Sequence, residues 1–382
     1  MRKVLFWLHL AAGVVAGVVI FIMSVTGTLL MYEKQMTAWF DSRSLPALSD
    51  GPRLPVETLL EKAKASRGKL PASITLQSES RTPVQLSYGR EVAYQDPATG
   101  NIIGAGDLQV RKFFRSVTDW HRWLAMSEDS RPAGRAITGY SNLIFLFIVL
   151  SGAVLWIPKV WTIASVRAIT LFRGGLSGKA RDFNWHNVIG VWCFIPLAFV
   201  VASGSVISFP WASNLVYSVM GSPVPTGGPG APPRGEGGRQ SEIELTGLNA
   251  LWDKARNETT GWRSISIRLP GSNKAPVTFQ IDQGYGGQPQ KRLTIAYDRS
   301  NGDVKSRESF DEFNAGRKAR TWLRFVHTGE FYGLTGQTIA GIASAGAAIL
   351  VFTGIALSLR RWAAWRSRRA RARIPVEETV SV

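Results

Sequence analysis

The sequence predicts an α-helical membrane protein with four transmembrane helices and two outer α+β domains, formed by a tandem duplication of helix, domain and helix. Three observations support this fold class. Four apolar stretches contain no charged residue, the two long polar stretches share one order of helix and strands, and a histidine–glycine pattern occurs twice at the same spacing.

The apolar stretches cover about residues 4–31, 137–157, 188–209 and 339–359. At a rise of about 1.5 Å per residue, each is long enough to cross a hydrocarbon core roughly 30 Å thick. The first follows Arg2 and Lys3, as in a signal peptide, but it is too long for the apolar region of one. We therefore expect four retained helices.

Basic residues indicate the orientation. The short segment between the second and third spans has one acidic residue, Asp182, and the basic residues Lys159, Arg167, Arg173, Lys179 and Arg181. Seven arginines follow the fourth span: Arg360, Arg361, Arg366, Arg368, Arg369, Arg371 and Arg373. Because basic loops stay in the cytoplasm, we expect cytoplasmic termini and outer segments at 32–136 and 210–338. The net charge of +18 then reflects topology and attraction to the lipid surface rather than nucleic-acid binding.

The two outer segments repeat one order. Helical spacing at 56–66 precedes alternating, strand-like runs at 72–77, 84–88 and 91–95, and a helix at 248–256 precedes runs at 264–268, 277–281 and 293–297. A turn from Asp96 to Gly100 recurs from Asp298 to Gly302. A Gly/Pro-rich linker at 221–238 precedes the second copy.

The membrane spans repeat as well. His9 precedes Gly13 by 13 − 9 = 4 and Gly27 by 27 − 9 = 18 residues, and His186 precedes Gly190 and Gly204 by the same intervals. Ser151-Gly152 and Thr353-Gly354 end equivalent patterns in the second and fourth spans. Small residues of this kind let helices, or a flat cofactor, approach a backbone, and helix packing is the commoner reason.

The chain has four histidines, and the duplication accounts for all of them. His9 and His186 lie at the inner ends of the first and third spans, whereas His121 and His327 lie at the outer ends of the second and fourth. A single histidine near a helix end is commonly an interfacial residue. Two depth-matched pairs instead favour axial ligation of two haem irons by neutral imidazoles. Zinc is the rival metal, but it takes at least three protein ligands.

Other features narrow the function classes. Cys193 is the only cysteine, which excludes intrachain disulfides and covalent haem attachment through a pair of cysteines. The spans carry almost no polar residue of the kind that a permease needs. Five tryptophans near the histidines fit haem packing and equally fit an interfacial aromatic belt: Trp7, Trp120, Trp123, Trp185 and Trp192. A basic strip of Arg111, Lys112, Arg115, Arg122 and Arg135 fits either haem propionates or a chelate, or a solvated face.

The duplicated helix–sheet segments, and the membrane histidines that follow an aromatic residue and, for His9 and His186, precede a glycine by four residues, resemble the PepSY-associated transmembrane family of bacterial iron-regulated membrane proteins, and most of all its di-haem siderophore reductases. The resemblance implies two periplasmic PepSY-like domains, the bacterial inner membrane, two non-covalent b-type haems, and reduction of a ferric siderophore with release of ferrous iron. It implies His9, His186, His121 and His327 as haem-iron ligands, paired by depth as His9 with His186 and His121 with His327.

The expected boundaries are 1–36, 119–158, 186–212 and 321–360 for the transmembrane helices, 37–118 and 213–320 for the PepSY-like domains, 159–185 for the basic loop and 361–382 for the basic tail. We expect a ferric siderophore, the lipid membrane and an unidentified electron donor, on the cytoplasmic or quinol side, as partners, and no nucleic acid. PepSY domains also occur in protease propeptides, so the alternative is a peptidase-modulating or binding membrane protein without redox activity.

Overall fold

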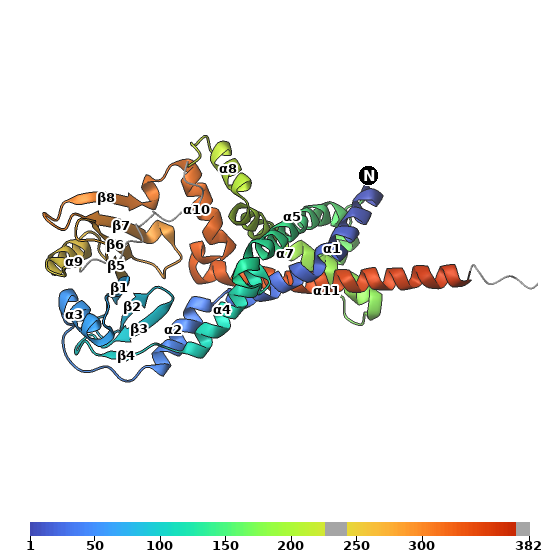
Figure 1. Cartoon of the computed structure of the whole chain (residues 1–382). Coiled ribbons are helices and arrows are strands. Elements are labelled where there is room, and N and C mark those ends of the chain that lie inside the picture. Colours follow the sequence, from blue (N-terminus) through green and yellow to red (C-terminus); the bar gives the residue numbers. More distant parts are fainter. Residues whose placement is uncertain (226–242, 372–382) are drawn as a thin grey trace, which may run out of the picture. The chain divides into compact units, whose positions relative to one another are not determined.

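The computed structural model describes residues 1–225 and 243–371 (Figure 1). Most of the predicted Gly/Pro-rich linker (226–238) and the end of the basic tail (372–382) lie outside these residues. The chain divides into two compact units. The helical unit contains Met1–Met31, Ser116–Ser208 and the chain from Gln337 onward, and the sheet unit contains Tyr32–Arg115 and Phe209–Gly336.

Four long helices account for the predicted spans: α1 (Arg2–Leu30), α5 (Arg131–Trp156), α7 (Gly178–Ser208) and α11 (Gly333–Arg371). Each is long and apolar enough to cross a membrane, which confirms the prediction of a multi-pass helical protein. Helix α5 packs against both α1 and α7. Their outward faces expose large apolar side chains such as Val15, Phe199 and Phe352, as contact with lipid requires.

Polar contacts within the helical unit are few and specific. Asn142 of α5 is buried and donates hydrogen bonds to the carbonyl of Val201 (2.9 Å) and to the hydroxyl of Ser205 (2.9 Å) on α7. A Cβ on Gly204 would lie only 3.1 Å from this amide, so glycine makes room for it. Around them lies a small apolar core that includes Val149, Cys193 and Ala347.

The sheet unit contains one antiparallel sheet of eight strands in the order β4-β3-β2-β1-β5-β6-β7-β8. Its first half is β1 (Ser73–Gln77), β2 (Val84–Tyr88), β3 (Glu91–Gln95) and β4 (Ile102–Gly104). Its second half is β5 (Ser264–Arg268), β6 (Val277–Asp282), β7 (Arg292–Tyr297) and β8 (Val304–Ser309). The sequence predicts two outer domains, whereas the structure pairs β1 with β5 and thereby joins both copies in one sheet.

Helices α3 (Val56–Arg67) and α9 (Leu248–Asn257) cover the same core. Residues that alternate along the central strands, such as Ile74, Ile265 and Ile267, are buried against them. The two helices also exchange hydrogen bonds, because Glu57 and Asn249 each receive the backbone N–H of the other, at 3.0 and 3.2 Å. The helices and strands that the sequence predicts for the two outer segments agree with the structure to within about one residue at each end, whereas the starts of α5, α7 and α11 differ by more.

Ile267→Ala is expected to lower the free energy of unfolding of the sheet unit by about 2–5 kcal/mol, because it removes a fully buried side chain. Ile267 lies opposite Ile74 at the β1–β5 junction, so the loss affects both copies. Thermal unfolding of the purified protein in detergent would measure it. Arg268→Ala, on the exposed next residue of β5, is the matched control. Equal melting temperatures for the two variants would contradict the proposed shared core.

Five shorter helices complete the helical elements of the described residues. They are α2 (Glu33–Ser44), α4 (Leu108–Trp123), α6 (Ile163–Thr170), α8 (Pro210–Val219) and α10 (Ala315–His327). Between α4 and α5 the chain turns at Leu124 and Ala125, which both have positive φ (52° and 54°) although neither is glycine. Four 3-10 turns complete the described residues: η1 (Glu128–Ser130), η2 (Pro289–Lys291), η3 (Phe310–Glu312) and η4 (Glu330–Tyr332).

Candidate functional site

Two histidines face each other inside the helical unit. The rings of His9, on α1, and His186, on α7, have centroids 6.5 Å apart and planes inclined by 85°. Metal–imidazole bonds of about 2.05 Å on opposite sides of one ion, with each ring centre roughly 1.15 Å beyond its nitrogen, would place the centroids about 6.4 Å apart. Each ring can rotate about its bond to the metal ion, so an angle of 85° between the two ring planes is also compatible with ligation of one ion. The pair therefore has the spacing of two axial imidazoles.

Each of these rings is held through Nδ1 by a hydroxyl group on a second helix. Nδ1 of His9 lies 2.9 Å from Oγ of Ser151 on α5, and Nδ1 of His186 lies 3.0 Å from Oγ1 of Thr353 on α11. The contact thus occurs once in each copy of the duplication. Because Nδ1 makes the hydroxyl contact in both rings, Nε2 is the nitrogen that would ligate a metal.

His121 has the same environment at the other end of α1. Its Nδ1 lies 2.9 Å from Oγ1 of Thr26. Residues 9 and 26 are 26 − 9 = 17 positions apart on one continuous helix, which corresponds to roughly 25 Å. His121 is therefore separated from His9 by most of a bilayer. His327 is the last residue of α10 and belongs to the sheet unit.

A glycine follows each hydroxyl residue and lies against the edge of the histidine ring. A Cβ on Gly152, Gly354 or Gly27 would lie 3.4, 3.4 or 3.3 Å from Cε1 of the neighbouring imidazole. At these distances an added Cβ would touch the ring, at or just inside ordinary van der Waals contact, so a larger residue would leave the imidazole little space. The glycines that the duplication places after Ser151, Thr353 and Thr26 thus keep the imidazoles close to the helix backbone.

The motif glycines one turn deeper border open space. A Cβ on Gly13 would meet nothing within 4 Å, and one on Gly190 would meet only Leu350 at 3.8 Å. Because these glycines are four residues from His9 and His186, they lie on the histidine faces of α1 and α7. A flat ring system bound between the two imidazoles would therefore have room beside both backbones. The residues present fit a haem in this respect.

Polar contacts join the same helix pairs at the ends that carry His9 and His186. The guanidinium of Arg2, at the start of α1, donates to the carbonyls of Leu155 (2.9 Å) and Ile157 (2.5 Å) at the end of α5. Buried Asp182, one turn before His186 on α7, lies 2.9 Å from both Arg181 and Arg360, the latter on α11. These contacts fix the two helix pairs that hold His9 and His186, and they place arginines beside the pair.

The ligand set distinguishes between metals. Among residues 1–225 and 243–371 there is no group of three or more His, Cys, Asp or Glu side chains that could hold a metal ion. A protein zinc site requires three or four such ligands, whereas a haem iron already has four ring nitrogens and requires two. Paired histidines without a third protein ligand match the second requirement.

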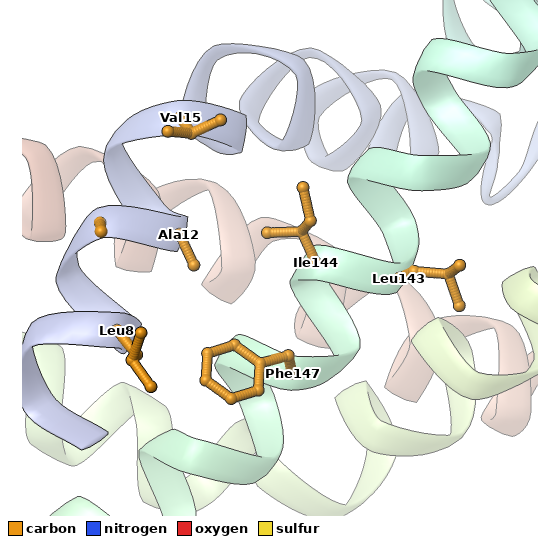
Figure 2. A pocket seen from close by; sticks show the side chains of 7 residues that line it. Leu8, Ala12, Val15, Leu143, Ile144 and Phe147 are labelled. Carbon is orange, nitrogen blue, oxygen red and sulfur yellow. The ribbon is translucent and has the colours of Figure 1, made fainter. Parts of the chain in front are cut away.

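A groove of about 610 Å³ lies between α1 and α5. Figure 2 shows its apolar lining: Leu8, Ala11, Ala12, Val15, Leu143, Ile144 and Phe147. Leu8, which precedes His9 in the chain, is part of this lining, and none of the lining side chains can form a hydrogen bond that would orient a charged chelate. This apolar surface favours contact with a hydrocarbon chain.

Arg111 of the predicted basic strip is part of a buried network in the sheet unit. The carboxylate of Asp41 accepts hydrogen bonds from the hydroxyl of Tyr94 (2.8 Å), the backbone N–H of Asp107 (2.7 Å) and the guanidinium of Arg111. Burial and the bond to Asp41 raise the pKa of Tyr94, so the phenol stays protonated at neutral pH. Arg111 therefore anchors α4 to α2 and β3, and this network accounts for its charge without a propionate or chelate.

A family model described as the PepSY-associated TM region matches residues 6–361. The chain belongs to this family. The match covers all four long helices and both halves of the sheet, which confirms the family to which the sequence shows a resemblance. No curated protein matches the sequence significantly. Membership in the PepSY-associated TM family establishes the architecture and leaves the chemistry to the site.

Three site residues are not predicted from the sequence, namely the hydroxyl residues Thr26, Ser151 and Thr353 that contact the histidine rings. The signal is present, because Thr26-Gly27, Ser151-Gly152 and Thr353-Gly354 each follow the duplication. Small residues in membrane helices usually indicate helix packing, however, and this reading accounts for them without any histidine. The contacts of 2.9–3.0 Å with Nδ1 atoms assign them to the site instead.

Proposed function

We propose that the protein is a transmembrane di-haem oxidoreductase of the bacterial inner membrane, which passes electrons to a ferric siderophore in the periplasm and releases ferrous iron. The observation that carries the proposal is the 6.5 Å separation of the His9 and His186 rings. In this proposal both termini are cytoplasmic, and the lipid membrane is the surrounding partner. The duplication supports it, since each copy supplies one histidine for each membrane face.

Four histidines would hold two b-type haems: His9 with His186 on the inner side, and His121 with His327 on the outer side. Haem supplies one-electron redox chemistry when bound. His9 and His186 would ligate through Nε2, because Nδ1 is engaged with Ser151 and Thr353. The apolar helix faces exclude water from the ligands, and burial of this kind tunes the redox potential.

The substrate step needs no general acid or base. Fe(III) in the siderophore gains one electron and becomes Fe(II), which the hard oxygen ligands of the chelate hold more weakly. The electron comes from a donor on the cytoplasmic or quinol side. Arginines next to the inner histidine pair, including Arg181 and Arg360, give that side a positive surface suited to an acidic donor.

Anaerobic reoxidation tests the proposal. We expect the purified protein, reduced with dithionite and freed of excess reductant, to show b-type haem bands that revert to the oxidised form when a ferric siderophore is added. Ferrous iron trapped by ferrozine should appear in proportion. The gallium complex of the same siderophore, which cannot be reduced to a divalent ion under these conditions, is the control and should leave the bands unchanged.

The alternative function gives a different result. A peptidase-modulating membrane protein without redox activity would be purified colourless, and it would change the activity of a peptidase instead. Such a protein would have no use for imidazoles at metal-ligand spacing.

A further inference from the structure

We infer that Ser151, Thr353 and Thr26 are positioning residues that hold His9, His186 and His121 as the Nδ1–H tautomer, with Nε2 aimed at the metal, and that they lower the redox potential of the ligated iron. This inference rests on the proposed haem ligation. Helix packing accounts for the small size of these three residues, but it does not account for their hydroxyl groups.

The single proton of each hydroxyl group is already directed to a backbone carbonyl. A hydroxyl has one proton to donate and two lone pairs that accept. Oγ of Ser151 lies 3.1 Å from the carbonyl of Ile148, and Oγ1 of Thr353 lies 2.8 Å from that of Ile349. Oγ1 of Thr26 lies 2.6 Å from the carbonyl of Ile22. Serine and threonine in helices direct their proton to such a carbonyl.

Because the hydroxyl proton is directed to the backbone, the hydroxyl oxygen can only accept the hydrogen bond from the ring. Nδ1–H of each histidine donates, and the hydroxyl oxygen accepts. A neutral imidazole that carries its proton on Nδ1 has its lone pair on Nε2, which is the form that ligates a metal. The tautomer is therefore selected by the neighbouring helix before any metal binds.

The same hydrogen bond affects the iron. An imidazole that donates its second N–H to an acceptor is the more basic ligand, and it is fixed in orientation. A more basic ligand favours the ferric over the ferrous state, and the midpoint potential falls. The adjacent glycine completes the arrangement, because it allows the Cε1 edge of the ring to approach the helix to which the hydroxyl belongs.

Two residues of the same spans are matched controls. Oγ1 of Thr28 on α1 lies 2.9 Å from the carbonyl of Ser24, and Oγ of Ser358 on α11 lies 2.8 Å from that of Gly354. Both hydroxyls bond their own helix, as Thr26 and Thr353 do. The structure gives neither of them a bond to a histidine ring within the described residues, so Thr28→Val and Ser358→Ala remove a hydroxyl without affecting the proposed ligands.

Redox titration of the purified protein, followed by the haem absorption bands, tests the inference. Thr353→Val keeps the side-chain shape and removes the acceptor, so the potential of the inner haem should rise. A tenfold loss of ferric relative to ferrous stability corresponds to about 59 mV for one electron. Ser151→Ala should act on the same haem, Thr26→Val on the outer one, and Thr353→Ser should restore the wild-type value.

Haem-loaded Thr353→Val and Ser151→Ala proteins with wild-type potentials would overturn the inference, as would a fall in potential or an equal rise in Thr28→Val. If Thr353→Val loses the inner haem, retention of haem in Thr353→Ser supports the role of the hydroxyl, and loss in both contradicts it. A wild-type protein that binds no haem contradicts the proposed function itself. A wild-type protein that binds haem but does not reduce siderophores leaves the positioning role standing.

Discussion

His9→Ala and His186→Ala are each expected to halve the haem content of the purified protein and to remove the same spectral component. The reason is the 6.5 Å separation of the two rings, which is the spacing expected of two imidazoles that ligate one iron. A b-type haem has no covalent bond to the protein, so loss of either iron ligand should release it. Pyridine haemochrome analysis would give the stoichiometry, and the reduced-minus-oxidised spectrum would identify the missing component.

The double variant His9→Ala with His186→Ala provides the control, because two ligands of one haem should cost no more than either alone. His121→Ala should instead remove the other component. A wild-type protein with about one haem, or two variants that remove different components, would contradict the pairing. The roughly 25 Å of α1 between His9 and the His121 contact at Thr26 makes a shared haem for those two impossible.

Most of the fold could be predicted from local patterns. Spans without charge and strands of alternating polarity carry their own signal, and the duplication identifies each element twice. The joining of the two sheet halves could not be predicted. The pairing of Ser73 with Arg268 is long-range, and nothing in either strand indicates whether it borders solvent or another strand. The sequence does not predict strand β8, because all but the last of its side chains are exposed and the sequence VKSRES lacks apolar alternation.

Two boundaries also differ for physical reasons. The sequence predicts His121 directly before the second span, whereas the structure places it in α4 and turns the chain at Leu124 and Ala125. No glycine indicates that turn, although positive φ usually favours one. Helix α11 continues to Arg371, beyond the apolar span, because the arginine- and alanine-rich sequence that follows the span has high helix propensity.

The candidate site was predictable as residues but not as contacts. The four histidines stand out because they are rare and repeated, and the adjacency of His9 and His186 agrees with their expected depth. The choice of tautomer depends on hydroxyls 142 and 167 residues away, a relationship that only the packing of α1 on α5 and of α7 beside α11 reveals. The candidate ligands can be proposed from the sequence, whereas the orientation of their rings is visible only in the tertiary structure.

His327→Ala is expected to abolish reduction of ferric siderophores, whereas His186→Ala should block only the supply of electrons from inside. His121 and His327 are expected at the outer ends of their spans, where a siderophore that has crossed the outer membrane would meet the protein first. The inner pair lies instead beside the arginines that suit a donor. Loss of an outer ligand should thus remove the haem that passes electrons to the siderophore, and loss of an inner ligand should remove the haem that accepts electrons from the donor.

Proteoliposomes separate the two roles, because reductant can be supplied on either side. With reductant inside, both variants should lose siderophore reduction. With dithionite added briefly outside and removed before the siderophore is added, the His186→Ala protein should still deliver one electron per outer haem, since its His121 and His327 are unchanged. The His327→Ala protein should deliver none from that side. Equal loss in both variants, with the outer haem of His186→Ala shown spectroscopically to be present, would contradict this division, because reduction would then require the inner haem itself rather than the electrons that pass through it.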